Sequence, residues 1–143
     1  MKSTDSRGVI EPKMFRIAEM YLIAAEAYAQ DGDITNAAYY LNELKRNRIA
    51  GYTDQTFASK DVIMQEIMDE RTREMVGEGT RMFDIKRWHI AVERGVAQQE
   101  DLCLLPGATT TDLVRPANSD RMTWPIPQNE IDLTDKIVQN PGY

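Results

Sequence analysis

The sequence predicts an all-α protein built from helical hairpins and followed by a long irregular segment at the C-terminal end. Apolar residues recur at spacings of three and four up to about residue 95, which is the period of an amphipathic helix. After Gly95 this periodicity stops, and five of the six prolines lie between residues 96 and 143. A chain of 143 residues is long enough to form one domain with its own core, so we expect a single helical domain over residues 12–143.

The first expected hairpin covers residues 12–50. Its first helix runs from about Pro12 to Asp31, and its second from about Ile34 to Ile49. Only Gly32 and Asp33 join them, so the helices must pack antiparallel. Small and aromatic residues alternate in a pattern typical of a tetratricopeptide-like hairpin, with a generic antiparallel helix pair as the alternative; the pattern consists of Tyr21, Ala24, Ala25, Tyr28, Ala37, Leu41 and Leu44.

A second helix pair is expected over residues 59–95. Ser59 is a suitable N-cap for a helix from about Lys60 to Val76, and a fourth helix is expected from about Thr80 to Arg94. Gly77 and Gly79 break the chain between them.

The two ends of the chain lack helical periodicity. Residues 1–11 carry no pattern and are expected to be disordered or the edge of a cut chain. Residues 96–143 are expected to wrap over the helices as a loop-rich segment, or to be completed by sequence that is absent here.

Composition and charge exclude several classes of protein. There are 17 Lys and Arg against 23 Asp and Glu, a net charge of −6, whereas a nucleic-acid binder needs a basic surface. The single cysteine, Cys103, has no partner for an intramolecular disulfide and lies in an apolar run, so we interpret it as a buried packing residue. The chain contains no signal-peptide pattern and no apolar run of about 18 residues.

A ladder of carboxylates follows the third expected helix at Glu66, Glu70, Glu74 and Glu78. Such a ladder could bind metal or serve acid–base chemistry. However, a di-metal bundle needs Glu-x-x-His pairs, and the one histidine, His89, has a lysine three residues before it. We therefore interpret the ladder as structural, paired with the interleaved arginines and lysines, and expect no metal site and no cofactor.

Catalytic signatures are weak. A nucleophile elbow is absent, and one histidine with one cysteine in apolar surroundings does not indicate a catalytic triad. The Gly77–Glu78–Gly79 segment lacks a third glycine and places an acid where a phosphate would bind, so it is interpreted as a helix break. We expect no catalytic residues.

Loop aromatics are the candidate ligand contacts. Aromatic faces can stack on the apolar faces of sugar rings, and Tyr52 and Trp124 lie in expected loops. The alternative for Trp124, which precedes Pro125–Ile126–Pro127, is that it fills the core.

Three motifs in order resemble those of the SusD/RagB family. The first is Arg16-x-x-Glu19-x-Tyr21-Leu22 with Glu26–Ala27, and the last combines Pro125–Ile126–Pro127 and Glu130 with Gln139–Asn140–Pro141–Gly142–Tyr143. The middle motif consists of Glu70–Arg71, Glu74, Glu78–Gly79, Arg81, Asp84 and Arg87–Trp88.

The resemblance implies a surface-exposed outer-membrane lipoprotein of Bacteroidetes-type bacteria that is non-catalytic. Such a protein binds a glycan or other nutrient and delivers it to a TonB-dependent, SusC-like transporter. Family members are several times longer, so the chain is expected to be a C-terminal part that packs against a missing N-terminal part. Cys103 does not match the anchoring lipobox cysteine, which would lie in that missing part. Glycan contacts vary within the family and are not assigned to numbered positions.

The shared charged residues are interpreted as an ion-pair network that holds the third and fourth helices together. Its expected members are Glu70, Arg71, Glu74, Glu78, Arg81, Asp84 and Arg87. If the network is buried, losing one partner is expected to cost about 3–5 kcal/mol. The alternative function is a tetratricopeptide-like scaffold that binds protein partners and no small molecule.

Overall fold

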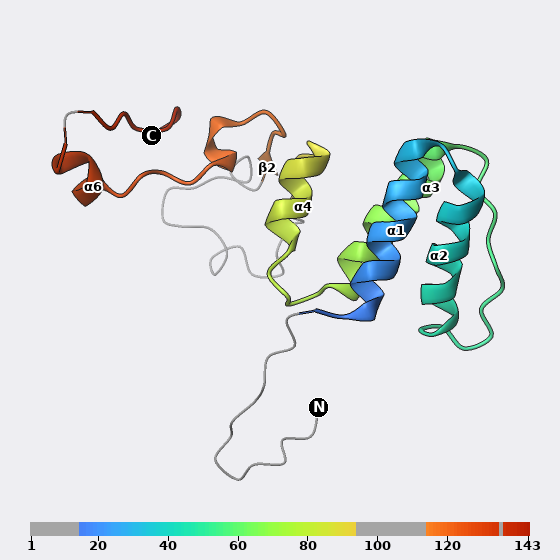
Figure 1. Ribbon diagram of the computed structural model, residues 1–143. Coiled ribbons are helices and arrows are strands. Elements are labelled where there is room, and N and C mark those ends of the chain that lie inside the picture. Colours follow the sequence, from blue (N-terminus) through green and yellow to red (C-terminus); the bar gives the residue numbers. More distant parts are fainter. Residues whose placement is uncertain (1–14, 94–113, 135) are drawn as a thin grey trace, which may run out of the picture. The chain divides into compact units, whose positions relative to one another are not determined.

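The computed structural model describes residues 15–93, 114–134 and 136–143 (Figure 1). The chain divides into two compact units, Met1–Glu78 and Gly79–Tyr143, and each is described by itself. Long and short helices account for most of the described regular structure, with one two-stranded ladder. The all-α prediction is therefore confirmed, whereas the single domain over residues 12–143 stays a prediction.

Unit 1 begins with the expected hairpin of α1 (Ile17–Asp31) and α2 (Ile34–Arg46). Gly32 ends α1 in the left-handed region at φ +90°, where a side chain would be strained. The next residue starts α2, because the Asp33 carboxylate accepts the backbone N–H of Asn36 at 3.0 Å. This hydrogen bond also lowers the pKa of Asp33. The two-residue turn thus carries both a helix stop and a helix start.

A third helix, α3 (Lys60–Glu74), packs with α1 and α2 around one apolar core (Figure 1). Ser59 caps it as expected, accepting the backbone N–H of Val62 at 3.4 Å. Alanines on α1 keep the helices close, since small side chains permit close backbone approach. The core residues are Ala18, Leu22, Ala25, Ala29, Ala37, Leu41, Leu44, Ile63, Met64 and Ile67.

The connection between α2 and α3 is held by a buried polar residue. Asn42 donates to the Gln55 carbonyl at 2.9 Å and accepts from the Gln55 backbone N–H at 3.1 Å. Its amide oxygen also accepts from the Tyr52 hydroxyl at 2.7 Å. One side chain therefore satisfies three polar groups of the loop.

Unit 2 contains α4 (Arg81–Trp88), the antiparallel pair β1 (Val92–Glu93) and β2 (Val114–Arg115), η2 (Asp120–Met122) and α6 (Gln128–Asp132). Its first helix is shorter than expected, because His89 adopts φ +52° and turns the chain out of the helix. The Ile90 N–H then bonds back to the Ile85 carbonyl at 3.2 Å, as at a typical helix end. The expected end at Arg94 was wrong. The expectation relied on Gly95 as the stop signal, whereas the helix ends at His89, a residue type that does not usually mark a helix end.

Helix ends in unit 1 also fall slightly short of expectation. The second helix ends at Arg46 instead of Ile49, and the third at Glu74 instead of Val76. Within the described residues, no helix is both long enough and apolar enough to span a membrane.

Candidate functional site

Unit 2 carries an open groove of about 690 Å³. This volume lies within the range of small-molecule sites, roughly 300–1,000 Å³. Residues of α4 form one side of the groove, and residues near η2 form the other. The lining is mostly apolar, so a ligand would need an apolar face to fill it.

Helical spacing places three α4 residues along the groove. Lys86 follows Met82 by four residues and Phe83 by three, so its side chain lies on the same side of the helix as theirs. The Phe83 side chain is 74% exposed, which leaves its ring accessible. Opposite elements contribute Met122, which is buried, and Trp124, which is 80% exposed.

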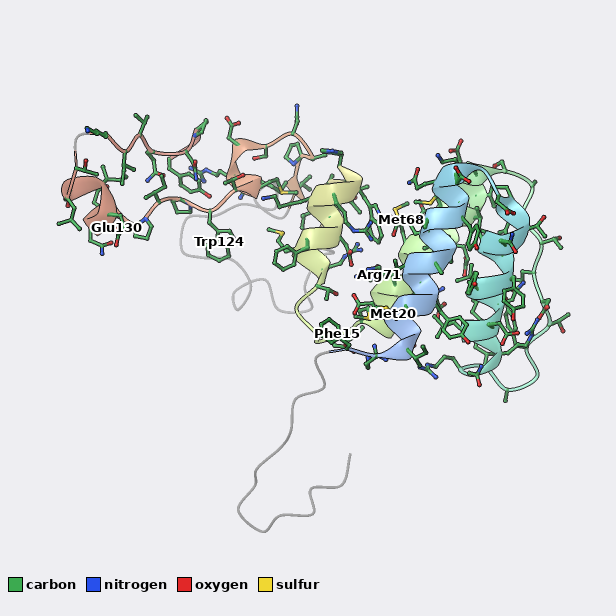
Figure 2. All side chains as sticks on the ribbon, viewed as in Figure 1. Phe15, Met20, Met68, Arg71, Trp124 and Glu130 are labelled. Carbon is green, nitrogen blue, oxygen red and sulfur yellow. The ribbon has the colours of Figure 1, made fainter. Side chains whose placement is uncertain are left out.

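The backbone around Trp124 is held by side chains of the C-terminal motif, Gln139–Tyr143. The Gln139 side chain donates to the Ile126 carbonyl at 2.9 Å and accepts the Ile126 backbone N–H at 2.8 Å. The Asn140 side chain donates to the Trp124 carbonyl at 2.7 Å. With its backbone held from one side, Trp124 projects its ring away from the chain (Figure 2).

The last residues close this clamp, which we define as the contacts of residues 139–143 with residues 120–126. Tyr143 donates its hydroxyl to the Thr123 carbonyl at 3.1 Å, and Arg121 donates to the Gly142 carbonyl at 3.1 Å. Gly142 has φ +91°, and a Cβ there would lie 3.2 Å from the Asp120 Cβ. A side chain at this position would therefore be strained by its backbone angle and would press tightly against Asp120.

The polar edge of the groove is basic. Lys86, Arg87 and His89 line it, and no acidic residue is among its described lining. Arg87 is engaged within unit 2, because it donates to the Asp84 carboxylate at 2.9 Å and lies 4.4 Å from the centre of the Trp88 ring. The arrangement offers aromatic faces next to positive charge.

Metal coordination finds no support in this part of the chain. Among residues 15–93, 114–134 and 136–143, no cluster of three or more His, Cys, Asp or Glu side chains could hold a metal ion. Cys103, which the sequence analysis interpreted as a packing residue, lies outside the described residues.

Tyr52, the other candidate ligand contact, is engaged inside unit 1. Its hydroxyl donates to Asn42, and its ring lies 5.7 Å from the Lys45 ammonium. Burial raises the pKa of Tyr52. These contacts give it a structural role, and a part in ligand binding stays a prediction.

The ion pairs of unit 1 converge on Glu74. Its carboxylate, with 8% of the side chain exposed, pairs with Arg16 at 2.6 Å and with Arg48 at 2.8 Å. Hydrogen bonding from Arg48 and then from Arg16 outweighs burial and lowers the pKa of Glu74 to about 2. The Glu74 carboxylate thus links Arg16 before α1 and Arg48 after α2 to the C-terminal end of α3.

Other acids of the ladder have partners within unit 1. Glu78 pairs with Arg16 at 2.6 Å, and Glu70 pairs with Arg73 at 2.7 Å. Glu66 pairs with Arg73 at 3.1 Å and also with Lys45. The ladder is therefore paired with cations, as its structural interpretation requires.

The remaining members of the expected network are distributed over both units. Arg71 pairs with Glu19 of α1 at 3.0 Å, and Arg87 pairs with Asp84 inside α4. Arg81, the first residue of α4, is also engaged in an interaction. A network that joins the third and fourth helices stays a prediction.

Sequence reasoning missed three partners of this cluster, Arg16, Arg48 and Glu19. Arg16 and Glu19 both belong to the first family motif, and their presence in it could have indicated a role in the ion pairs. Arg48 follows α2 with no local pattern to mark it, and only the packing of the helices brings it to Glu74.

The sequence matches the SusD family over residues 1–143, and the chain belongs to this family. It is 29% identical over 136 residues to SusD-like protein P25 of Formosa agariphila, covering 91% of this chain and 24% of that protein. It is 30% identical over 131 residues to the starch-binding protein SusD of Bacteroides thetaiotaomicron, covering 91% of this chain and 21% of that protein.

A solved structure agrees with this assignment. A SusD superfamily protein from Bacteroides vulgatus matches with a TM-score of 0.71 and 29% identity, over 98% of this chain and 30% of that one. The family predicted from the three motifs is confirmed. The chain spans about a quarter of the length of the curated relatives it matches.

Proposed function

We propose that this chain is the C-terminal part of a SusD-like protein that binds a glycan or another nutrient without catalysing a reaction. The observation that carries the proposal is the open groove of a SusD-family chain, in which the Phe83 and Trp124 rings are exposed. Aromatic faces of this kind stack on the apolar faces of sugar rings. The name of one relative, the starch-binding protein SusD, describes the same class of ligand for that protein.

The proposal extends to location and partner. As a SusD-like component, the whole protein would be anchored as a lipoprotein at the outer-membrane surface and would deliver its ligand to a SusC-like, TonB-dependent transporter. Membership of the SusD family supports this placement. The part of the relatives that this chain does not cover would carry the export signal and the lipobox cysteine.

Isothermal titration of the whole protein against plant, host and bacterial glycans tests the proposal. Measurable heat with at least one glycan, together with co-purification of the transporter, is the expected result. A Trp124→Ala variant tests whether the groove contributes to glycan binding. Tyr39→Ala, which removes an exposed aromatic side chain of unit 1, serves as its control.

A protein-binding scaffold remains the second candidate, and α1 provides the observation that favours it. Besides the side packed in the core, this helix carries a second apolar side with Ile17, Met20 and Ile23 exposed. Figure 2 shows Met20 on the side of α1 away from α2. A helix that is apolar on two sides is typical of one packed between two partners. Repeated absence of heat with every glycan, with transporter association intact, would favour this candidate.

A further inference from the structure

The charge of the groove differs from the charge of the chain. The chain has a net charge of −6, yet the described lining of the groove holds Lys86, Arg87 and His89 and no acidic side chain. A basic site on an acidic protein concentrates positive potential at one place.

Two of the three basic side chains are available to a ligand. Arg87 is already bonded to Asp84 and stacked on Trp88. Lys86 and His89 are exposed and form no ion pair or side-chain hydrogen bond within the described part of the chain. Lys86 lies one turn along α4 from Phe83 and Met82, so it shares a side of the helix with an exposed aromatic residue.

We propose that this groove binds a saccharide that carries a carboxylate or sulfate group. The inference rests on the proposed function and adds the class of glycan. The apolar face of a sugar ring would stack on Trp124 or Phe83, and the anionic substituent would accept hydrogen bonds from Lys86 and His89.

The mixed lining is what selects this ligand class. A free inorganic anion would leave the exposed Trp124 and Phe83 rings without a partner. A neutral saccharide would gain no ion pair with the Lys86 ammonium. A sugar ring with an acidic substituent meets both requirements, and the groove volume of about 690 Å³ accommodates a short oligosaccharide.

The test compares ligand pairs that differ only at the anionic group. Trigalacturonic acid and its fully methyl-esterified form are titrated calorimetrically into the full chain, and a sulfated galactose disaccharide is compared with its unsulfated counterpart. The charged member of at least one pair is expected to bind about five- to tenfold more tightly, which is the factor expected for one charge-assisted hydrogen bond at an exposed site. This preference should shrink as NaCl is raised, because exposed charges are screened. The pair that shows the preference distinguishes carboxylate from sulfate.

Variants assign the effect to residues. Lys86→Gln is expected to remove the preference for the charged ligand while retaining binding of the neutral one. Lys136→Gln, at an exposed lysine elsewhere in unit 2, is the matched control and should change neither. Trp124→Ala should weaken both members of a pair, and circular dichroism verifies that each variant is folded.

Each contrary outcome has a separate meaning. Equal affinity for charged and neutral ligands, with dependence on Trp124, overturns the anionic class and leaves glycan binding in place. Binding that is insensitive to both Lys86→Gln and Trp124→Ala overturns the groove as the site. If Trp124→Ala instead converts an oligomer to a monomer and no probe binds, the groove's occupant is a protein surface and the inference fails. The proposed function fails only if the wider glycan panel is negative as well.

Discussion

At the scale of single residues, Glu74 shows how one side chain can depend on several elements. Its two arginine partners come from before α1 and after α2, whereas Glu74 itself ends α3. Because both partners favour the ionised form, the pKa of Glu74 falls from 4.5 to about 2. The folded state therefore binds this proton less tightly than the unfolded state.

That difference predicts a dependence of stability on pH. A group with a lowered pKa in the folded state contributes fully above its unfolded value, and its contribution is lost as the pH falls through the folded value. We expect the Glu74 contribution to decline between pH 4.5 and about 2. Glu74→Gln should lower the free energy of unfolding at pH 7 by about 1–3 kcal/mol, since its arginine partners are partly exposed.

Urea unfolding followed by circular dichroism at several pH values measures this effect. Asp31→Asn, at an exposed carboxylate at the end of α1, is the control and should retain the wild-type pH profile. A Glu74→Gln variant that kept the full acid-dependent loss of stability would contradict the assigned role.

Asn42 gives a second prediction at this scale. Asn42→Ala leaves the Tyr52 hydroxyl and two backbone groups of Gln55 without their partner, so we expect a loss of about 2–3 kcal/mol. Tyr52→Phe removes one of the three hydrogen bonds and should cost about 1 kcal/mol. Thermal unfolding of both variants measures the difference. Equal losses in the two variants would mean that the two hydrogen bonds between Asn42 and the Gln55 backbone add nothing to stability.

At the scale of elements, the clamp formed by residues 139–143 explains the closing motif of the sequence. The side chains of Gln139 and Asn140 and the hydroxyl of Tyr143 all bond to the backbone of residues 123–126. Short irregular segments have few backbone hydrogen bonds of their own, so side chains must satisfy their polar groups. The motif therefore positions Trp124 without contacting the groove.

The clamp predicts a local change when Gln139 is removed. Gln139→Ala breaks the two hydrogen bonds to Ile126, so exchange of the Ile126 amide hydrogen should accelerate about five- to thirtyfold, the range that corresponds to about 1–2 kcal/mol. Hydrogen exchange followed by NMR measures it. Gln128→Ala, at a side chain that donates to Asp132 at 2.8 Å and to no other described residue, is the control. Unchanged protection of Ile126 in Gln139→Ala would remove the basis for the clamp.

At the scale of the whole molecule, the exposed apolar side of α1 predicts self-association. Ile17, Met20 and Ile23 are exposed together, and contiguous apolar surface of this kind favours protein contacts. We expect the chain to form oligomers at high concentration through this side. Ile23→Glu should raise the monomer fraction while changing the free energy of unfolding by less than about 0.5 kcal/mol, as is usual for surface substitutions.

Sedimentation velocity over a range of concentrations measures the monomer fraction. Thr35→Ser, a small exposed substitution on α2, away from this side of α1, is the control and should leave association unchanged. A chain that stays monomeric at every concentration would mean that this side of α1 does not drive contacts between copies.

Features that depend on neighbouring residues could be predicted from the amino-acid sequence. Periodicity predicted the helices, Gly32 and Asp33 predicted the turn of the hairpin, Ser59 predicted a cap, and three motifs predicted the SusD family. These signals are local, because a helix face, a left-handed glycine and an N-cap are all set within about four residues.

Features that depend on residues distant in sequence became visible only in the folded chain. Arg48 reaches Glu74 across 26 positions of sequence, and Gln139 reaches Ile126 across 13. The early end of α4 at His89 likewise places a basic side chain at the groove without a glycine to signal it. Such contacts follow from how the packed elements meet, and neither spacing nor residue type marks them along the chain.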